Sequence, residues 1–355
     1  MASNRKQSPQ RAAARGATSG QGPRRLGNQA PPPARSAGAQ RRADRARRSS
    51  SSKRIGWIAV AAVVIVAVVL VAVTLSGSSK PKTSTSANGV ATGQDPALAS
   101  AAYVDAVTTI PTSVYNSIGT AGQPVPFTVT KGQPALTRGG KPLFLYEGAE
   151  YCPYCAMMRY AMVAALSRFG TWSHLHQTTS GSSDGNVPTF TFYRSAYSSP
   201  YLTFQSYESL DRQEPTPAPL ETIPGWATKL YTKYDGSETT GAAAAPFNAS
   251  GSAGIPFLDL GNKYVSAGDP AAFSSLWPAG GPLHNGGPGR LAIAQGIRNP
   301  TTATGQYVHG ALFVAQANYL SAGICSLTGN KPATVCSSPG VKAAAKAIAQ
   351  AKPVA

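Results

Sequence analysis

The 355-residue chain carries 32 lysines and arginines against 14 aspartates and glutamates, a formal charge of +18 that is unevenly distributed. Residues 1–54 hold 14 of the basic side chains and one acidic one, so they account for +13, and the remainder carries only +5. This distribution excludes a uniformly basic globular protein. Because residues 1–54 contain a single leucine and no aromatic residue, they cannot bury enough apolar surface to fold, and we expect them to be disordered.

An uncharged, almost continuously apolar run extends from Ile55 to Leu75. A helix of this length, at about 1.5 Å per residue, spans the roughly 30 Å core of a bilayer, so we predict a transmembrane helix over residues 55–76. A cleaved signal peptide is the alternative, but its apolar part is shorter, about 7–15 residues, and its basic part is short. The preceding positive charge predicts a single-pass cell-membrane protein with a cytoplasmic N-terminus and an extracytoplasmic C-terminal domain.

The basic tail has two candidate partners. Nucleic acid is one, but no aromatic residue interleaves with the arginines to stack on bases, so we predict no nucleic-acid binding. Membrane lipid is the partner we expect, because positive charge beside a membrane helix also attracts anionic headgroups. Residues 77–94 are rich in Gly, Ser and Thr and predict a flexible linker, which leads to an outer domain over residues 95–355.

The outer domain begins with a predicted helix in which Asp95 is the N-cap and Pro96 the first helical residue. A second short helix is expected around Val114 and Ile118. The later patterns predict these elements in chain order: strands over 126–130 and 143–146, an amphipathic helix over 156–169, strands over 187–196 and 200–209, a short helix over 226–234, a hairpin over 255–268, and helices from 269 onward. This order predicts an α/β fold.

Two cysteines, Cys152 and Cys155, lie between the strand at 143–146 and the helix that follows it. One helical turn brings residues at this spacing to about 5–6 Å between Cα atoms, which is within disulfide range. We expect Cys152 to face solvent at the helix start, where free N–H groups and the helix dipole stabilise its thiolate, and Cys155 to be shielded. Cys152 is then the nucleophile and Cys155 the resolving thiol of an exchange reaction that needs no cofactor.

Two carboxylates precede the cysteines. Glu147, if buried beneath the end of the strand, is a candidate acceptor for the proton of Cys155 during resolution, and Glu150 is expected on a solvated rim. Arg159, one turn after Cys155, is a candidate to counter their charge. Because these effects oppose each other, the residues do not decide between an oxidant, a reductant and an isomerase.

The order of strand, Cys-Pro-Tyr-Cys and helix resembles the thioredoxin superfamily, and this dipeptide is typical of glutaredoxins. The resemblance implies a thioredoxin-like fold, here with additional N- and C-terminal helices, and a cis-proline opposite the redox pair. Val187–Pro188 and Ile255–Pro256 compete for that position, and we favour Pro256 because it precedes the predicted hairpin. The substrate groove is then expected to be lined by residues around the cysteines and the proline: Tyr151, Pro153, Tyr154 and Ile255.

A closer resemblance is to the domain of unknown function 929 family, which is thioredoxin-like and often membrane-anchored. It depends on GGKPLFLYEGAEYCPYCAMMRYAMVAALSRFG at 139–170 and GIPFLDLGNKYV at 254–265, and it would cover about residues 95–350. The family implies no settled activity. No His or Lys lies between the cysteines, and the outer region far exceeds the roughly 80–110 residues of a minimal fold, which limits the analogy to thioredoxin itself.

The remaining cysteines and histidines leave alternatives open. Cys152 and Cys155 could instead form a permanent structural disulfide, or half of a zinc or copper site completed by two nearby histidines, His174 and His176. Cys325 and Cys336 bracket a polar turn, and an even number of thiols outside a membrane favours pairing, so we predict a structural disulfide there. The alternative for that second pair is a relay that passes electrons to Cys152.

These features predict a membrane-anchored, extracytoplasmic thiol–disulfide oxidoreductase. Its expected partners are cysteine-containing exported proteins and a membrane redox partner that reoxidises or reduces Cys152 and Cys155. The alternative function is a non-catalytic thioredoxin-like binding module of the cell envelope.

Overall fold

The computed structural model describes four stretches of the chain: residues 96–235, 254–268, 270–300 and 309–353. All four belong to one unit of the chain. The predicted tail, transmembrane helix and linker, residues 1–94, lie outside the described residues.

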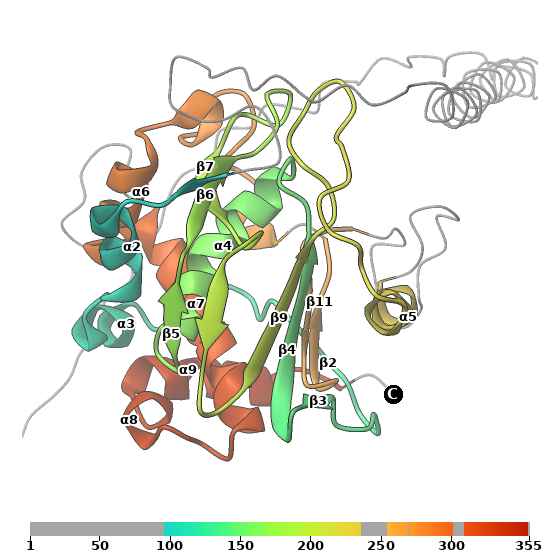
Figure 1. Cartoon of the computed structure of the whole chain (residues 1–355). Coiled ribbons are helices and arrows are strands. Elements are labelled where there is room, and N and C mark those ends of the chain that lie inside the picture. The colour runs from blue at the N-terminus through green and yellow to red at the C-terminus, as the bar shows by residue number, and fades with distance from the viewer. Residues whose placement is uncertain (1–95, 236–253, 269, 301–308, 354–355) are drawn as a thin grey trace, which may run out of the picture. The chain divides into compact units, whose positions relative to one another are not determined.

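The described residues form a mixed α/β structure (Figure 1). Its strands are β1 (Ala97–Leu98), β2 (Thr128–Val129), β3 (Thr137–Arg138), β4 (Lys141–Gly148), β5 (Thr171–Ser173), β6 (His176–Thr179), β7 (Pro188–Thr191), β8 (Ala196–Ser198), β9 (Thr203–Glu208), β10 (Phe257–Leu260) and β11 (Tyr264–Ser266). Its helices are α2 (Ala101–Thr108), α3 (Thr112–Ile118), α4 (Pro153–Leu166), α5 (Gly225–Tyr234), α6 (Arg290–Arg298), α7 (Gly310–Leu327), α8 (Ala333–Cys336) and α9 (Pro339–Gln350), with short 3₁₀ turns η1 (Ala271–Phe273) and η2 (His284–Gly286).

The main sheet is mixed and has β4 at its centre. β9 runs parallel to β4 on one side, and β10 runs antiparallel to it on the other. β11 and β2 extend the sheet beyond β10, and β3 pairs with the start of β4. The predicted hairpin over 255–268 is confirmed as β10 and β11, which a Gly261–Asn262 turn connects with positive φ angles of 69° and 57°.

The two faces of the main sheet pack against different helices. α4 and α7 lie on one face and α5 on the other, as Figure 1 shows. Leu145 and Phe257 pack toward α5 in a small hydrophobic cluster, whereas Phe144 and Tyr146 of the same strand belong to the large cluster with α4. This separation follows from the period of two in a strand, which sends successive side chains to opposite faces.

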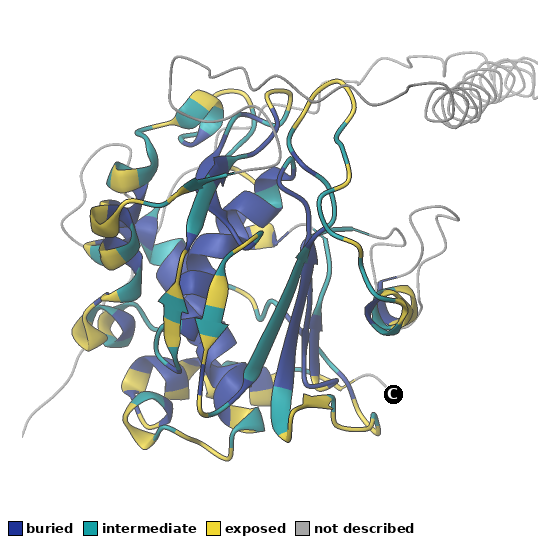
Figure 2. Ribbon diagram, in the orientation of Figure 1, coloured by how far each residue is buried: buried dark blue, intermediate teal, exposed yellow. Residues whose placement is uncertain are grey.

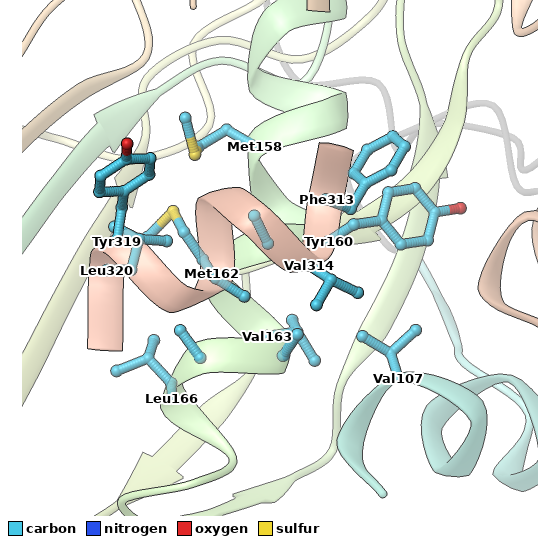
Figure 3. Close-up of a cluster of buried hydrophobic side chains, with 14 of the residues drawn as sticks. Val107, Met158, Tyr160, Met162, Val163, Leu166, Phe313, Val314, Tyr319 and Leu320 are labelled. Atoms are coloured by element: carbon cyan, nitrogen blue, oxygen red, sulfur yellow. The ribbon is translucent and has the colours of Figure 1, made fainter. Parts of the chain in front are cut away.

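α4 is buried on every side, which differs from the amphipathic helix that the sequence indicated. All of its residues except Tyr154 are buried, and it lies within the dark-blue interior of Figure 2. The reason is that α4 has the sheet on one side and α7 on the other. Figure 3 shows Met158, Met162 and Val163 of α4 interleaved with Phe313 and Leu320 of α7, so the methionines fill the core as expected.

The N-terminal helix starts later than predicted. Ser100, rather than Asp95, caps α2, because its side chain accepts a hydrogen bond from the backbone N–H of Tyr103. Ala97 and Leu98 are extended instead, and they pair with β6 at the edge of a small three-stranded sheet. The strand predicted over 187–196 is also divided, into β7 and β8, since Arg194 adopts a positive φ of 60° between them.

Within the described residues, α7 is the one helix that is long and apolar enough to cross a bilayer by length and composition. Its most apolar window is 78 % buried inside the protein. A central helix of a folded domain passes the same test, and the packing of α7 against α4 places it in the core.

Candidate functional site

The first cysteine pair lies where β4 leads into α4. Cys152 is the N-cap of α4, with extended backbone angles, and its sulfur accepts a hydrogen bond from the backbone N–H of Cys155 at 3.3 Å. Pro153 is buried at the first helical position, where its missing N–H would have had no partner. Both cysteines are free thiols. The structure therefore contains a close dithiol at a helix start, as the spacing predicted.

The start of β10 brings Ile255 and Pro256 beside this pair. Phe257, the next residue, is paired with the end of β4, so the residues before it lie next to the loop that leads to α4. The Cys152 thiol donates a hydrogen bond to the carbonyl oxygen of Ile255 at 3.5 Å. The Ile255–Pro256 bond is cis, as expected, and Val187–Pro188 is not among the cis bonds of the described chain. A part for Pro256 in catalysis stays a prediction.

Cys152 is more buried than the sequence indicated. Only 5 % of its surface is exposed, and Cys155 has no exposed surface. Burial, followed by the neighbouring Cys155 thiol, raises the pKa of Cys152 well above its usual value, while the Cys155 N–H and the charge of Arg159 act in the opposite direction. The expected solvent-facing Cys152 is therefore wrong, because surrounding segments exclude the water that would stabilise its thiolate.

Two segments distant in the sequence cover the cysteine motif. The backbone N–H of Gly181 donates to the carbonyl oxygen of Tyr151 at 2.8 Å. The ring of Tyr154 packs edge-on against Trp277, with ring centroids 5.8 Å apart. Three of the predicted groove residues are partly exposed: Tyr151, Tyr154 and Ile255.

A buried ion pair beneath the motif was not predicted. Arg159 of α4 and Glu208 of β9 are both fully buried and are joined by two hydrogen bonds, Nη2 to Oε2 at 2.6 Å and Nε to Oε1 at 2.8 Å. Arg159 Nη2 also donates to the carbonyl oxygen of Ala149, in the loop before Cys152, at 2.8 Å. Because desolvation offsets the attraction of buried charges, such a pair adds little stability. The pair lies directly beneath the cysteine motif and is thus part of the polar surroundings of the site.

Tyr146 hydrogen-bonds to this ion pair and lies near the sulfur of Cys155. Its hydroxyl donates to Glu208 Oε2 at 3.5 Å. A Cβ atom added to Gly148 would collide with the Tyr146 hydroxyl and would lie 3.1 Å from Cys155 Sγ, so the hydroxyl and the sulfur are neighbours around that glycine. Burial raises the pKa of Tyr146 well above its usual value, so the residue is a neutral hydroxyl at neutral pH.

One feature of the sequence could have indicated this network. Arg159 is the only charged residue of α4, and a charge within a buried helix needs a partner. The sequence does not indicate that the partner is Glu208, 49 positions later. Glu208 comes close to α4 only because β9 pairs with β4, and that pairing is a feature of the tertiary structure.

The two carboxylates before the motif are both buried. Glu147 points to the opposite face of β4 from the side that Cys155 occupies, toward α5. Burial and then the charge of Asp235 raise the pKa of Glu147 to about 7. Glu150, expected on a solvated rim, is buried instead, accepts a hydrogen bond from Thr178 Oγ1 at 3.1 Å, and has a pKa raised by burial. The structure therefore does not bring Glu147 to Cys155.

The second cysteine pair, Cys325 and Cys336, forms a disulfide that joins α7 to α8, with 5.6 Å between Cα atoms. The end of α7 lies beside the turn after β10, because a Cβ on Gly261 would approach the side chain of Leu327 to 2.7 Å. Ile255 and Gly261 are at opposite ends of β10, about 20 Å apart at roughly 3.3 Å per residue. This separation fits a structural disulfide better than an electron relay to Cys152.

The metal-site alternative for the first pair receives no additional ligands from the described residues. No group of three or more His, Cys, Asp or Glu side chains in these stretches could hold a metal ion. His176 lies in β6, where it pairs with Thr191 of β7, and His174 precedes it with a positive φ of 55°.

Comparison with known proteins gives a single similarity. No curated protein and no solved structure matches the chain. The matched family segment extends from β2 to just beyond α6, which is shorter than the 95–350 expected from the sequence. It contains Cys152, Cys155 and Pro256 but not the disulfide. Residues 128–302 of this protein are thus similar to the family described as Domain of unknown function (DUF929).

Proposed function

We propose that this protein is a thiol–disulfide oxidoreductase in which Cys152 attacks a disulfide and Cys155 resolves the mixed disulfide. The observation that carries the proposal is the position of the Cys152 sulfur, between the backbone N–H of Cys155 at 3.3 Å and the carbonyl oxygen of Ile255 at 3.5 Å. A client strand beside Ile255 would place its own sulfur next to Cys152, and the free dithiol has the spacing needed to close into a disulfide.

The arrangement of elements supports a thioredoxin-like fold for this site. β4 is followed by α4 with the cysteines at its start, β9 is parallel to β4, and the hairpin β10–β11 is antiparallel on the other side. The helices α6 to α9 would then be additions after this unit, and α2 and α3 additions before it.

The proposed clients are cysteine-containing exported proteins. The disulfide between Cys325 and Cys336 supports an oxidising, extracytoplasmic location, since such bonds are rare in the cytosol. The apolar span from Ile55 to Leu75 supports a single membrane anchor, and the anchor would keep the domain near membrane lipid and near a membrane redox partner that restores the cysteine pair.

A second candidate, a non-catalytic binding module with the same fold, is favoured by one observation. The Cys152 thiol is almost fully buried, and its pKa is raised rather than lowered, whereas reactive cysteines are usually exposed and acidic. An oxidoreductase would need the covering segments around Tyr151 or Trp277 to open when a client binds.

Mixed-disulfide trapping with the full-length protein tests the choice between these functions. We expect Cys155→Ala to accumulate a disulfide between Cys152 and a cysteine-containing peptide, and Cys152→Ser to lose exchange by about three orders of magnitude or more, as for removal of a nucleophile. A thiol reagent applied after mild reduction should label Cys152 while Cys325 and Cys336 stay protected. Equal exchange by the wild type and Cys152→Ser would exclude the enzyme and leave the binding module.

A further inference from the structure

The buried polar network behind Cys155 lies on the side of β4 away from the proposed client. Glu208, in β9, is paired with Gly148 on one edge of β4, whereas Ile255 precedes β10 on the other edge. A client that approaches Cys152 beside Ile255 therefore leaves the Tyr146 side of Cys155 unobstructed. That side is available for proton movement during resolution.

A cleft on the surface reaches the outer end of this network. The cleft has a volume of about 240 Å³, and its lining includes Phe192, Ser206 and Glu221. Two of these residues contact Glu208: the backbone N–H of Phe192 donates to Glu208 Oε1 at 3.3 Å, and the Glu221 carboxylate accepts the backbone N–H of Glu208 at 2.7 Å. These contacts place the cleft next to Glu208, whose carboxylate is itself fully buried.

We propose that Tyr146 and Glu208 take up the proton of the Cys155 thiol during resolution, while Arg159 holds the Glu208 carboxylate in place. The proposal rests on the thiol–disulfide exchange described above. It also replaces Glu147, the acceptor expected from the sequence, with the neighbouring residue of β4, because strand alternation sends Tyr146 and not Glu147 to the face of Cys155.

The step balances as follows for a client that is being reduced. Cys155 Sγ bonds to Cys152 Sγ, the bond between Cys152 and the client sulfur breaks, and the client sulfur leaves with the electron pair. The cysteine pair is thereby oxidised and the client cysteine reduced. The proton of Cys155 passes to the oxygen of Tyr146, which gives its own proton to the Glu208 carboxylate. A tyrosine hydroxyl suits this position because it both accepts and donates a hydrogen bond.

A two-phase single-turnover experiment isolates this step. Reduced full-length protein is mixed rapidly with an equimolar symmetric pyridyl disulfide, which releases one coloured thiol when Cys152 attacks and a second when Cys155 resolves. We expect Tyr146→Phe to leave the first phase within about twofold of the wild type and to slow the second at least about tenfold, given the range of acid–base contributions. Glu147→Gln is the matched control, since it alters the adjacent residue on the opposite face, and it should change neither phase.

Two further measurements separate a proton route from a packing defect. In D₂O the second phase of the wild type should slow, and Tyr146→Phe should lose most of that isotope effect. Glu221→Gln removes a carboxylate whose charge, beside Glu208, favours a proton on Glu208, so it should slow the second phase by about threefold without affecting the first. This variant tests the proposal if Tyr146→Phe does not fold.

Each outcome bears on the route in a different way. Unchanged second phases in both Tyr146→Phe and Glu221→Gln would overturn the route while leaving the exchange reaction intact. If Glu147→Gln slows the second phase instead, the acceptor of the Cys155 proton is Glu147, on the face of β4 toward α5, and the proposed route is wrong. Absence of the first phase in the wild type would reject the exchange reaction itself, and the route with it.

Discussion

The two cysteine pairs of the described chain are both buried, but they lie in different surroundings. Cys325 and Cys336 belong to the large hydrophobic cluster, where their disulfide joins two helices. Cys152 and Cys155 belong to neither hydrophobic cluster and are free thiols, three positions apart, with the Arg159 ion pair beneath them. One pair is closed into a disulfide within a hydrophobic cluster, and the other lies as free thiols next to a buried guanidinium and carboxylate.

This difference teaches that burial alone does not decide what a cysteine does. Burial raises the pKa of Cys152, which by itself would make the thiol inert. The Arg159 guanidinium favours a buried thiolate at Cys152, and the Tyr146 hydroxyl lies near the Cys155 sulfur, whereas a closed disulfide has no thiol proton to transfer. Changing the surroundings of each pair separately should therefore have different consequences.

The largest expected effect comes from removing the cation beneath the first pair. Arg159→Met should lower the free energy of unfolding by about 3–5 kcal/mol, because it leaves Glu208 charged, buried and unpaired. It should also slow alkylation of Cys152, whose pKa the arginine charge lowers. Urea unfolding of the full-length protein measures the first quantity, and labelling with a thiol reagent measures the second.

The matched control for that experiment is Arg168→Met, just after α4. Arg168 donates to three neutral side chains, and its loss leaves no buried charge behind: its acceptors are Asn318, Ser321 and Ser338. The loss of stability should be smaller, and Cys152 labelling should not change. If both variants lose the same free energy of unfolding, then leaving the Glu208 charge without Arg159 costs no more than losing hydrogen bonds to neutral side chains.

A smaller effect on stability, and none on exchange, is expected from opening the second pair. The Cys325→Ala, Cys336→Ala double variant should lose about 3 kcal/mol, the chain-entropy value for a loop of this size. Its two-phase reaction with the pyridyl disulfide should match the wild type wherever the protein is folded. Loss of repeated turnover in the presence of a reductant, with the single turnover intact, would indicate that this pair, once reduced to a dithiol, passes electrons to the oxidised Cys152–Cys155 pair after all.

The last effect concerns the face of β4 away from the cysteines, and it reaches its full size only at high pH. Folding raises the pKa of Glu147 from 4.5 to about 7, so between these values the unfolded chain has released a proton that the folded chain keeps. Stability should therefore fall as pH rises through this range and then stay level. Glu147→Gln should remove that contribution, adding up to about 3 kcal/mol above pH 7 and nothing below pH 4.

Urea unfolding of Glu147→Gln and of the wild type across this pH range checks the direction of the pH dependence of stability. A residual slope should persist in the variant, since burial also raises the pKa of Asp259 and of Glu221 to about 7. A gain in stability at low pH only would contradict the assignment of Glu147 to a dry site.

Local patterns predicted much of the secondary structure. The Gly261–Asn262 turn indicated the hairpin, because both residues tolerate the positive φ angles that connect two strands tightly. Cysteines at 152 and 155 around a proline indicated a helix start, because the free N–H groups of a first turn donate hydrogen bonds to a side chain at the cap position. The start of α2 was missed, since the pairing of Leu98 with β6 overrides the local preference of Pro96 for a first helical position.

By itself, then, the sequence determined the hairpin around Gly261 and Asn262, the helix start at Cys152 and Cys155, and that residues 325 and 336 can pair, since these depend on neighbours in the chain. Tertiary structure alone decided that Cys152 is buried, that Tyr146 rather than Glu147 faces Cys155, and that Arg159 meets Glu208. These depend on which strand lies beside β4 and which helix covers each face. Desolvation and charge pairing depend on residues that are distant in the sequence, so the spacing of residues along the chain does not predict them.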